Sequence, residues 1–257
     1  MTSVSARITL SLVGIGCGDP EQLTLAAIRA INAADLILIP RKGSEKSELA
    51  DLRRTICADV LTNDNTRVVE FDLPVRDAGA DDYRKGVDEW HDAVAETWSR
   101  EIKNHLGHEG RVALLIWGDP SLFDSSLRIA RRLDPLPDIE VIPGVTSIQA
   151  LCAAHALPVN EIGESFLVTT GRRLRDDGWP DHLNTVVVML DGGAAFQSLN
   201  TEGLTIWWGA YLGMPNEILM SGALAETGPH IVAARNAARE KHGWIMDIYL
   251  LRESDPD

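Results

Sequence analysis

Cysteine is scarce in this chain. Its three cysteines, Cys17, Cys57 and Cys152, are odd in number and far apart, and they form no Cys-x-x-Cys pair. Neither a disulfide framework nor a thiolate metal site is therefore expected. We interpret the three side chains as reduced thiols in a reducing compartment.

Long apolar runs are also missing. Met1 to Arg7 lacks the apolar core of a signal peptide, and no later run reaches the roughly 18 apolar residues that a membrane helix needs. At 257 residues, with the composition of an ordinary globular protein, the chain can bury a large core. We expect a cytoplasmic protein with no membrane partner.

Positive charge is in deficit. The formal net charge of −14 argues against a nucleic-acid partner, because such a partner needs a basic face. An acidic small molecule can still bind to a local cluster of arginines. His105 and His108 have no third candidate ligand nearby, so no metal site is predicted.

What the chain does have is a glycine-rich turn near its start. An apolar strand over 8–13 leads into Gly14-Ile-Gly16-Cys-Gly18-Asp19-Pro20, and a helix is predicted over 21–34. Glycine at alternate positions lets a ligand approach the backbone closely. A dinucleotide site is disfavoured, because Asp19 stands where that motif has its third glycine and Arg41 where it has an acidic residue.

The first part of the chain repeats a strand, a turn and a helix. Strands are predicted over 8–13, 36–40, 67–73, 111–117 and 139–142. Helices are predicted over 44–60, 81–106 and 125–133 and from Ser147 to about His155, with a loop over 77–82. This rhythm indicates a mostly parallel sheet, whose ligands bind at the carboxyl ends of the strands.

A second domain is predicted after an interruption over 156–163, giving domains over 1–157 and 162–257. Its predicted strands are 165–170, 185–190, 204–209, an edge strand over 217–223, and 244–251. A charged turn over 171–177 and a helix over 230–242 complete it. Because parallel-sheet signals are fewer here, we expect a mixed sheet.

Three turns carry a resemblance to a known family. Gly18-Asp19-Pro20 and Gly118-Asp119-Pro120 each follow a strand, and Pro143-Gly144-Val145-Thr146-Ser147 follows a third. In this order, the turns resemble those of the tetrapyrrole (corrin/porphyrin) methyltransferases. The resemblance spans nearly the whole chain. It implies an α/β fold of two αβα domains with S-adenosylmethionine in the cleft between them, and a homodimer.

The resemblance also implies which residues contact the cofactor. S-adenosyl-L-methionine would be the methyl donor and S-adenosyl-L-homocysteine the product. The implied contacts are Pro20, Trp117, Gly118, Asp119, Leu122, Thr146, Ser147 and Met189, with Gly209 or Ala210 as the last contact. Bare backbone suits this ligand better than a phosphate cradle does, since its adenosine is neutral and its amino acid is zwitterionic.

Within the family, the sequence resembles the subgroup that forms precorrin-6A with loss of acetate. The features are Gly-Ile-Gly-Cys-Gly-Asp-Pro at 14–20, Trp117 before the second turn, the long spacer between the turns, and the segments 207–209 and 243–246. The implied substrate is a polycarboxylate tetrapyrrole, methylated at ring carbon 1. Positioning alone can lower such a barrier by about 7–11 kcal/mol.

Deacylation needs a proton acceptor or a positioned water. Candidate acceptors are Asp19, Asp119, Asp124, His155 and Tyr211. Candidate groups for the substrate are Gly16 in the opening turn and the cations Arg41, Lys42, Arg172, Arg173 and Arg175.

Each assignment has an alternative. Gly-Asp-Pro alone more often marks the start of a helix, with Asp as its N-cap. Met189 can be plain core, the arginines at 172–175 can be solvated, and His155 can simply end its helix. The substrate can be uroporphyrinogen III, another precorrin, a diphthine precursor or ribosomal RNA, although the acidic charge disfavours RNA. A module that binds a tetrapyrrole or the cofactor without catalysis is the alternative of another class.

Overall fold

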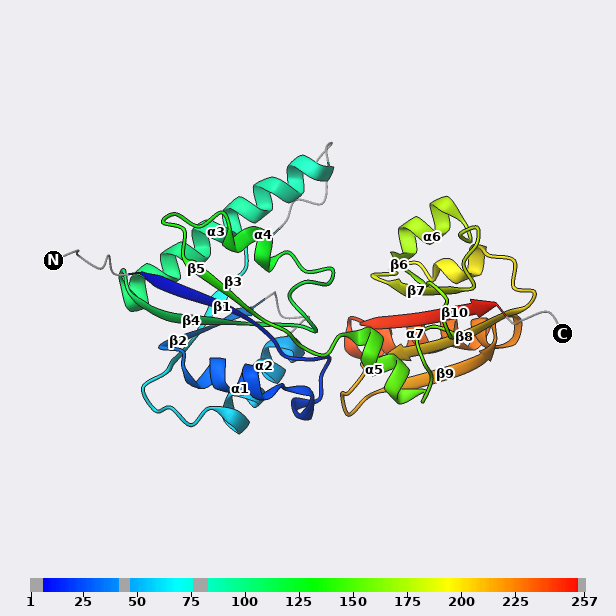
Figure 1. Cartoon of the computed structure of the whole chain (residues 1–257), viewed down its shortest axis with the longest axis horizontal. Coiled ribbons are helices and arrows are strands. Elements are labelled where there is room, and N and C mark those ends of the chain that lie inside the picture. Colours follow the sequence, from blue (N-terminus) through cyan, green and yellow to red (C-terminus); the bar gives the residue numbers. More distant parts are fainter. Residues whose placement is uncertain (1–6, 42–46, 76–82, 254–257) are drawn as a thin grey trace. The chain divides into compact units, whose positions relative to one another are not determined.

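The computed structural model describes residues 7–41, 47–75 and 83–253 (Figure 1). Its contacts divide the chain into two compact units. One holds the chain up to Gly16 together with Pro20–Val145, and the other holds Cys17–Asp19 together with the chain from Thr146 onward. Lys42 and the predicted loop over 77–82 lie outside the described residues.

The first unit is built on a wholly parallel five-stranded sheet in the order β3-β2-β4-β1-β5. The strands are β1 (Ile8–Gly14), β2 (Leu36–Arg41), β3 (Arg67–Asp72), β4 (Gly110–Ile116) and β5 (Asp138–Ile142). All five strands were predicted from the sequence to within two residues. The parallel arrangement is confirmed.

Helices cover both faces of this sheet (Figure 1). Leu10, Leu12 and Leu114 pack in one core with residues of α3 (Tyr83–Leu106) and α4 (Ser126–Ala130). Val13, Ile37 and other residues of the opposite face pack with α1 (Leu25–Asn32) and α2 (Ser47–Val60). Because both faces of the sheet are covered, the central strands β1, β2 and β4 are mostly buried and rich in apolar residues, and each buried Val, Leu or Ile contributes about 1.5–3 kcal/mol.

The first predicted helix is in fact divided. A short 3-10 helix, η1 (Pro20–Gln22), precedes α1, because Thr24 interrupts the helix and caps the next one. Its Oγ1 accepts a hydrogen bond from Ala27 N at 3.0 Å. The sequence therefore predicted helical structure in the right region, 21–34, but not the N-cap at Thr24 that divides it.

The second unit has a mixed five-stranded sheet in the order β6-β7-β10-β8-β9. The strands are β6 (Leu167–Thr170), β7 (Thr185–Met189), β8 (Leu204–Ala210), β9 (Ile218–Ala223) and β10 (Asp247–Glu253). Only β6 and β7 pair in parallel; the other neighbours are antiparallel. The predicted mixed sheet and the edge strand over 217–223 are confirmed.

Four helical segments pack on this sheet: α5 (Ser147–Ala154), α6 (Gly171–Asp177), η3 (Ala195–Ser198) and α7 (Leu224–His242). The predicted charged turn over 171–177 is wrong, because Thr170 caps these residues into helix α6 through its hydrogen bond from Arg173 N. The start predicted for α7 at His230 is also wrong. The helix continues through Pro229, since its buried residues Leu224, Gly228 and Ile231 offset the roughly 3 kcal/mol that an interior proline costs.

Helix α5 belongs to the second unit, whereas the sequence placed the boundary after it, at 156–163. The reason is packing. Leu151 lies against Gly209 of β8, and His155 Nε2 is 3.0 Å from Trp208 O. In the described part of the chain, no helix is long and apolar enough to cross a membrane.

Candidate functional site

The predicted site in the first unit lies at the carboxyl ends of its central strands. Gly14 ends β1, Gly118 follows β4, and Gly144 follows β5, so neighbouring strands bring the three glycines together. A Cβ on Gly144 would lie 2.2 Å from Gly118 O, and a Cβ on Gly14 would lie 2.6 Å from Gly144 N. Any side chain at Gly14 or Gly144 would push the turns apart, so the strand ends present bare backbone.

Backbone hydrogen bonds join the first two turns. Gly118 N donates to Gly16 O at 2.8 Å, and Ile15 N donates to Ile116 O at 2.9 Å. The predicted substrate-facing residue Gly16 and the predicted cofactor contact Gly118 are therefore direct partners. The two turns form one rigid strip of backbone.

Asp119 connects the second turn to the third. Its Oδ2 accepts a hydrogen bond from Gly144 N at 2.9 Å, and its Oδ1 accepts from Ser121 N at 2.8 Å and from Ser121 Oγ at 2.5 Å. Burial by itself would raise the pKa of Asp119, but these three hydrogen bonds outweigh it and hold the pKa below its ordinary value. A low pKa and engaged oxygens suit a positioning group better than a proton acceptor.

Other predicted contacts surround this strip. Trp117 and Leu122 are half-buried beside buried Gly118 and Asp119, and Pro20 is half-buried at the start of η1. Asp124 accepts a hydrogen bond from Ser126 N at 2.6 Å at the start of α4, which is a capping role. Arg41, at the end of β2, is half-exposed and lies 3.1 Å from Asp72 on the adjacent strand.

Sequence reasoning missed Arg53 of α2. Its Nε donates to Leu115 O at 2.9 Å, next to the end of β4, and its Nη1 donates to Leu49 O at 3.0 Å. Burial lowers the pKa of Arg53 to about 10, against the opposing effect of Asp124, and the guanidinium stays charged at neutral pH. Nothing in the sequence of an ordinary polar helix distinguishes Arg53 from its neighbour Arg54, so only the fold could find it.

In the second unit, the predicted residues lie at one end of the sheet, where strands β7 and β8 finish, and we call this end the edge. Met189 ends β7, and Ala210 ends β8. The first residue of β10, Asp247, pairs with Ala210, while Tyr249 pairs with Val188, so β10 lies between the two strand ends. At the usual strand spacing, Met189 and Ala210 are roughly 10 Å apart.

Helix α5 points its N-terminus toward the same edge. Its residues Leu151 and His155 lie against Gly209 and Trp208, so the helix runs antiparallel to β8. Thr146 is the N-cap, and its Oγ1 accepts a hydrogen bond from Ile148 N at 3.2 Å. Thr146 and Ser147 are half-buried there.

The opening turn contributes Cys17–Asp19 to this unit. Gly18 has φ 148°, and a Cβ on it would lie 2.4 Å from Met214 Cγ and 3.0 Å from Leu212 O. Only glycine fits here. Asp19, which follows it, is half-exposed.

The remaining candidate proton acceptors hold structural contacts. Tyr211 is 1% exposed and donates its hydroxyl hydrogen to Trp244 O at 2.5 Å, with the Trp244 ring edge-on at 5.1 Å. His155 Nε2 contacts Trp208 O at 3.0 Å. These positions favour packing roles for both side chains.

The predicted arginines of α6 are exposed. Arg173 pairs with Asp177 at 3.0 Å and Arg175 with Asp176 at 3.4 Å, both on the same helix, and Arg172 is exposed beside them. Helix α6 begins directly after Thr170, the last residue of β6, and Thr170 pairs with Met189 of β7. The three arginines are therefore near the predicted edge, in solvent.

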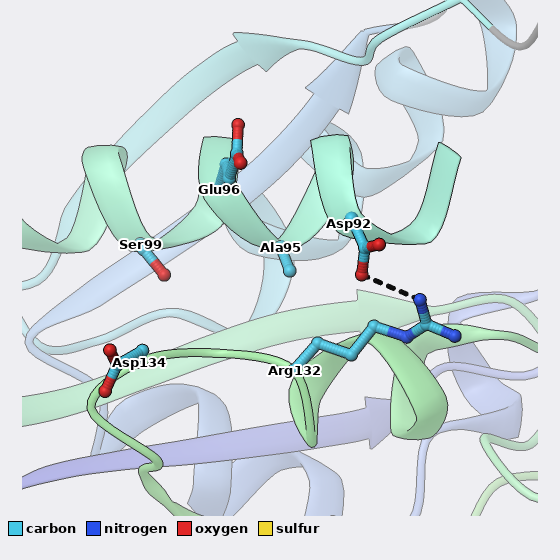
Figure 2. A pocket seen from close by; sticks show the side chains of 6 residues that line it. All are labelled: Asp92, Ala95, Glu96, Ser99, Arg132 and Asp134. Atoms are coloured by element: carbon cyan, nitrogen blue, oxygen red, sulfur yellow. Dashed lines mark hydrogen bonds and ion pairs between the residues drawn. The ribbon is translucent and has the colours of Figure 1, made fainter. Parts of the chain in front are cut away.

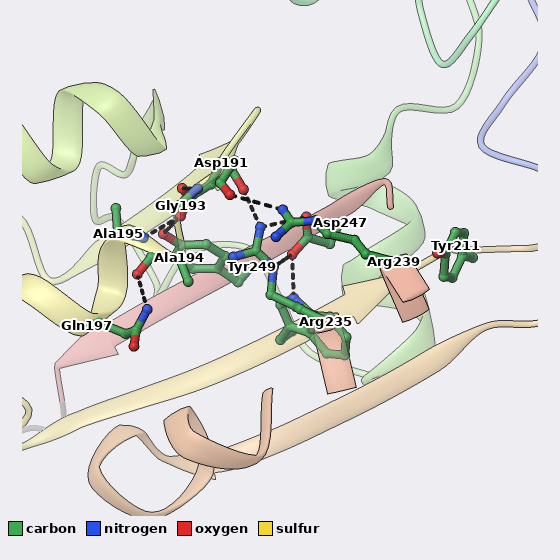
Figure 3. A network of polar contacts seen from close by, with 12 residues as sticks. Asp191, Gly193, Ala194, Ala195, Gln197, Tyr211, Arg235, Arg239, Asp247 and Tyr249 are labelled. Atoms are coloured by element: carbon green, nitrogen blue, oxygen red, sulfur yellow. Dashed lines mark hydrogen bonds and ion pairs between the residues drawn. The ribbon is translucent and has the colours of Figure 1, made fainter. Parts of the chain in front are cut away.

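A buried polar network at this edge was also missed (Figure 3). It joins Asp191, Arg235, Asp247 and Tyr249. The sequence did hold one signal, since Asp191-Gly-Gly directly follows a predicted strand. Arg235 lies in a polar, alanine-rich helix, and nothing in that stretch of sequence indicated that its side chain is buried.

A pocket lies outside the predicted site, and possible metal ligands are not clustered in the described residues. A pocket between α3 and the segment after α4 is lined by Asp92, Ala95, Glu96, Ser99, Arg132 and Asp134 (Figure 2). Arg132 is held there by Asp92 and Asp88, each at 2.7 Å, and none of the predicted site residues lines this pocket. Among the described residues, no group of three or more His, Cys, Asp and Glu is placed to hold a metal ion.

Comparison with known proteins gives consistent matches. The family model of the Tetrapyrrole (Corrin/Porphyrin) Methylases matches residues 9–228. A precorrin-6A synthase (deacetylating) of Sinorhizobium sp is 48% identical over 246 residues, covering 94% of each chain. The crystal structure of a putative cobalamin synthesis related protein (CobF) from Corynebacterium diphtheriae has a TM-score of 0.82 and 39% identity, and the match covers 97% of this chain and 100% of that one.

A more distant structure shares the fold. The uroporphyrin-III C-methyl transferase from Thermus thermophilus, solved with S-adenyl homocysteine, has a TM-score of 0.57 at 22% identity, with 95% of this chain and 97% of that chain covered. Together with the two-sheet α/β architecture, these matches confirm the resemblance predicted from the three turns. The chain belongs to the tetrapyrrole (corrin/porphyrin) methylases.

Proposed function

We propose that the chain is an S-adenosylmethionine-dependent C-methyltransferase that forms precorrin-6A in cobalamin biosynthesis. It methylates precorrin-5 at ring carbon 1, and the acetyl group leaves as acetate after addition of water. The observation that carries this proposal is the 48% identity to a precorrin-6A synthase (deacetylating) over 94% of both chains. The relative named CobF supports the same assignment along its whole length.

The residues present fit this cofactor. Glycines stand at the ends of β1, β4 and β5, and at Gly14 and Gly144 an added Cβ would meet neighbouring backbone at 2.6 and 2.2 Å. In the first unit, half-buried Trp117 offers apolar surface that suits an adenosine. In the second unit, half-buried Met189 offers apolar surface at the end of β7. When bound, S-adenosylmethionine supplies an electrophilic methyl group on a sulfonium.

The chain's own part in the reaction is to bind and orient. We assign cofactor contacts to Pro20, Trp117, Gly118, Leu122, Thr146, Ser147, Met189, Gly209 and Ala210. Asp119 holds the backbone of the second and third turns in register and is a positioning residue. Gly16, Arg41 and the exposed arginines Arg172, Arg173 and Arg175 face the carboxylates of the substrate. Among the candidate proton acceptors, Asp19 is the preferred one to test, because it lies in the opening turn directly after Gly18, on the proposed substrate side.

The reaction is tested directly with precorrin-5 and S-adenosylmethionine labelled in its methyl group. Mass spectrometry should find one labelled methyl in the tetrapyrrole and one equivalent of acetate. Methylation without acetate would refute the deacetylating assignment. Labelling of precorrin-2 or uroporphyrinogen III in place of precorrin-5 would assign a different substrate.

The cofactor is tested separately by thermal unfolding. A ligand that binds only the folded chain, present at a hundred times its Kd, stabilises it by about 2.7 kcal/mol. S-adenosylhomocysteine should therefore raise the Tm, and binding of it without turnover of any tetrapyrrole would favour a non-enzymatic binding module.

We also propose a cytoplasmic homodimer, which light scattering after gel filtration would detect as twice the 28.1 kDa chain mass.

A further inference from the structure

The buried network of the second unit centres on Arg235 of α7, which is 2% exposed. Its Nε lies 2.8 Å from Asp247 Oδ2 as an ion pair, and its Nη2 donates to the main-chain oxygen of Asp191. Arg239, one turn later, donates from its Nη2 to Gly192 O at 3.0 Å. Two arginines of one helix face therefore hold two consecutive carbonyls of the loop that follows β7 (Figure 3).

Asp247 carries this connection to the neighbouring strand. Its Oδ2 also accepts a hydrogen bond from Trp208 Nε1 at 2.8 Å, and Trp208 directly precedes Gly209. Asp247 itself pairs with Ala210. The Asp247 carboxylate thus links the loop two residues after Met189 with the end of β8, the two places where this unit carries proposed cofactor contacts.

The Asp191 side chain closes the loop on itself. Its Oδ1 accepts a hydrogen bond from Gly193 N at 3.0 Å, and its Oδ2 accepts from Ala195 N at 2.6 Å and from Tyr249 Oη at 2.7 Å. The same loop holds Leu190 at φ 52° and Ala194 at φ 56°, which are unfavourable conformations for these residues. Such conformations persist only where surrounding contacts over-determine them, as happens at functional sites.

Stability alone does not account for an ion pair of this kind. Arg235 and Asp247 have side chains only 3% and 6% exposed, so both ions lose their hydration. Burial raises the pKa of Asp247, and Arg235 and Trp208 oppose that rise. A buried ion pair gains little over apolar packing of the same volume, and its best-attested use is to specify one arrangement of the elements it joins.

We infer that Arg235 is a positioning residue of the cofactor site: with Asp247 it fixes the loop after β7 against the end of β8, so that Met189 and Gly209 keep the spacing that S-adenosylmethionine requires. This inference rests on the proposed function, because it takes these residues as cofactor contacts. Arg235 itself touches no ligand in this scheme.

The test compares Arg235→Lys with a matched control on the same sheet. Arg252 of β10 is also largely buried, pairs with Glu161, and donates from its Nη2 to Pro158 O at 2.8 Å. It lies opposite Thr185 at the start of β7, the end of the sheet remote from Met189. Arg235→Lys should raise the Kd for S-adenosylhomocysteine roughly tenfold to a hundredfold, as small misplacements of binding groups do, while Arg252→Lys should leave it unchanged.

A second variant separates binding from folding. Arg235→Met combined with Asp247→Asn removes both buried charges and keeps an acceptor for Trp208 Nε1. The double variant should recover Tm relative to Arg235→Met alone and still bind the ligand weakly. Recovery of both Tm and affinity would show that Arg235 acts only on stability, and would overturn the inference.

The wild-type chain gives a measurement that needs no variant. Without ligand, the amides of Gly193 and Ala195 should already exchange slowly with deuterium, because Asp191 holds them. Fast exchange of both would overturn the inference. A wild-type chain that binds no S-adenosylhomocysteine would refute the proposed function and the inference with it, whereas normal wild-type binding with unchanged affinity in Arg235→Lys would refute the inference alone.

Discussion

At the scale of single residues, Asp119 shows how a residue in a family motif can act through hydrogen bonds alone. It ties Ser121 of its own turn to Gly144 of the next. In Asp119→Asn, an amide NH2 replaces one oxygen and faces an N–H donor. We expect a loss of about 1–3 kcal/mol in the free energy of unfolding at pH 7.

The pH dependence of that loss follows from the direction of the pKa shift. The pKa of Asp119 is lower in the folded chain than in the unfolded one, so its contribution is present above about pH 4 and is lost as the pH falls through the folded pKa. Urea unfolding of wild type and Asp119→Asn should therefore converge on acidification. A constant difference from pH 7 to about pH 3 would contradict this assignment.

A single substitution at Tyr211 distinguishes a catalytic role of its hydroxyl from a structural one. Its hydroxyl donates to Trp244 O inside the protein. Tyr211→Phe should lower stability by about 1–3 kcal/mol, because a buried carbonyl loses its partner. It should change kcat by less than about tenfold, whereas removal of a general acid or base costs about 10²–10⁴. A large fall in kcat with unchanged stability would return Tyr211 to the catalytic set.

Asp19 is the complementary case, since it is half-exposed at the predicted substrate side of the opening turn. We expect Asp19→Ala to lower kcat more than it weakens binding of S-adenosylhomocysteine. Steady-state kinetics and calorimetry measure the two quantities separately. Equal losses in both would place Asp19 among the cofactor contacts.

At the scale of elements, the close approach of three strand ends is the least tolerant feature of the first unit. A methyl group on Gly144 would overlap Gly118 O. Gly144→Ala should cost about 1–3 kcal/mol, as overpacking does, and should also abolish measurable cofactor binding. Gly192→Ala is the stability control, because a Cβ there has nothing within 4 Å. Equal Tm values for the two variants would disprove the close packing.

The elements themselves were largely readable from the sequence. Residues 8–13 and 111–117 are rich in apolar residues because both faces of a parallel sheet are covered, and such segments are hard to mistake. Boundaries failed where a single side chain decided them: Thr24 divides the first helix, and Thr170 turns a charged segment into α6. Pro229 led to a predicted start of α7 that was too late. The helix continues through this proline because burial of neighbouring residues outweighs the helix-breaking preference of proline.

The site was readable only in part, for a related reason. The three turns are local motifs, so Gly18, Gly118 and Gly144 could be found one by one. The hydrogen bond from Gly144 to Asp119 and the contact of Arg235 with Asp191 join residues that are distant in sequence. No periodicity or spacing encodes such partners, and Arg53 and Arg235 therefore look like solvated helix residues until the fold is known.

At the scale of the whole molecule, the net charge of −14 must be reconciled with an anionic tetrapyrrole. We propose that exposed arginines such as Arg172 and Arg173 attract the substrate carboxylates at short range, while the net charge of the chain repels the substrate at long range. The screening length falls from about 30 Å at 0.01 M salt to about 8 Å at 0.15 M. Moderate salt should therefore remove the repulsion and leave the close ion pairs largely intact.

We accordingly expect kcat/KM for the tetrapyrrole to rise as salt increases from about 0.01 to 0.15 M, because screening speeds association of like-charged partners. The Kd for S-adenosylhomocysteine is the internal control, since its zwitterionic amino acid and neutral adenosine carry no net charge for the field to repel. That Kd should stay constant over the same range. If kcat/KM instead falls steadily from the lowest salt, local attraction by the arginines governs encounter, and Arg172→Ala together with Arg173→Ala should then abolish the dependence.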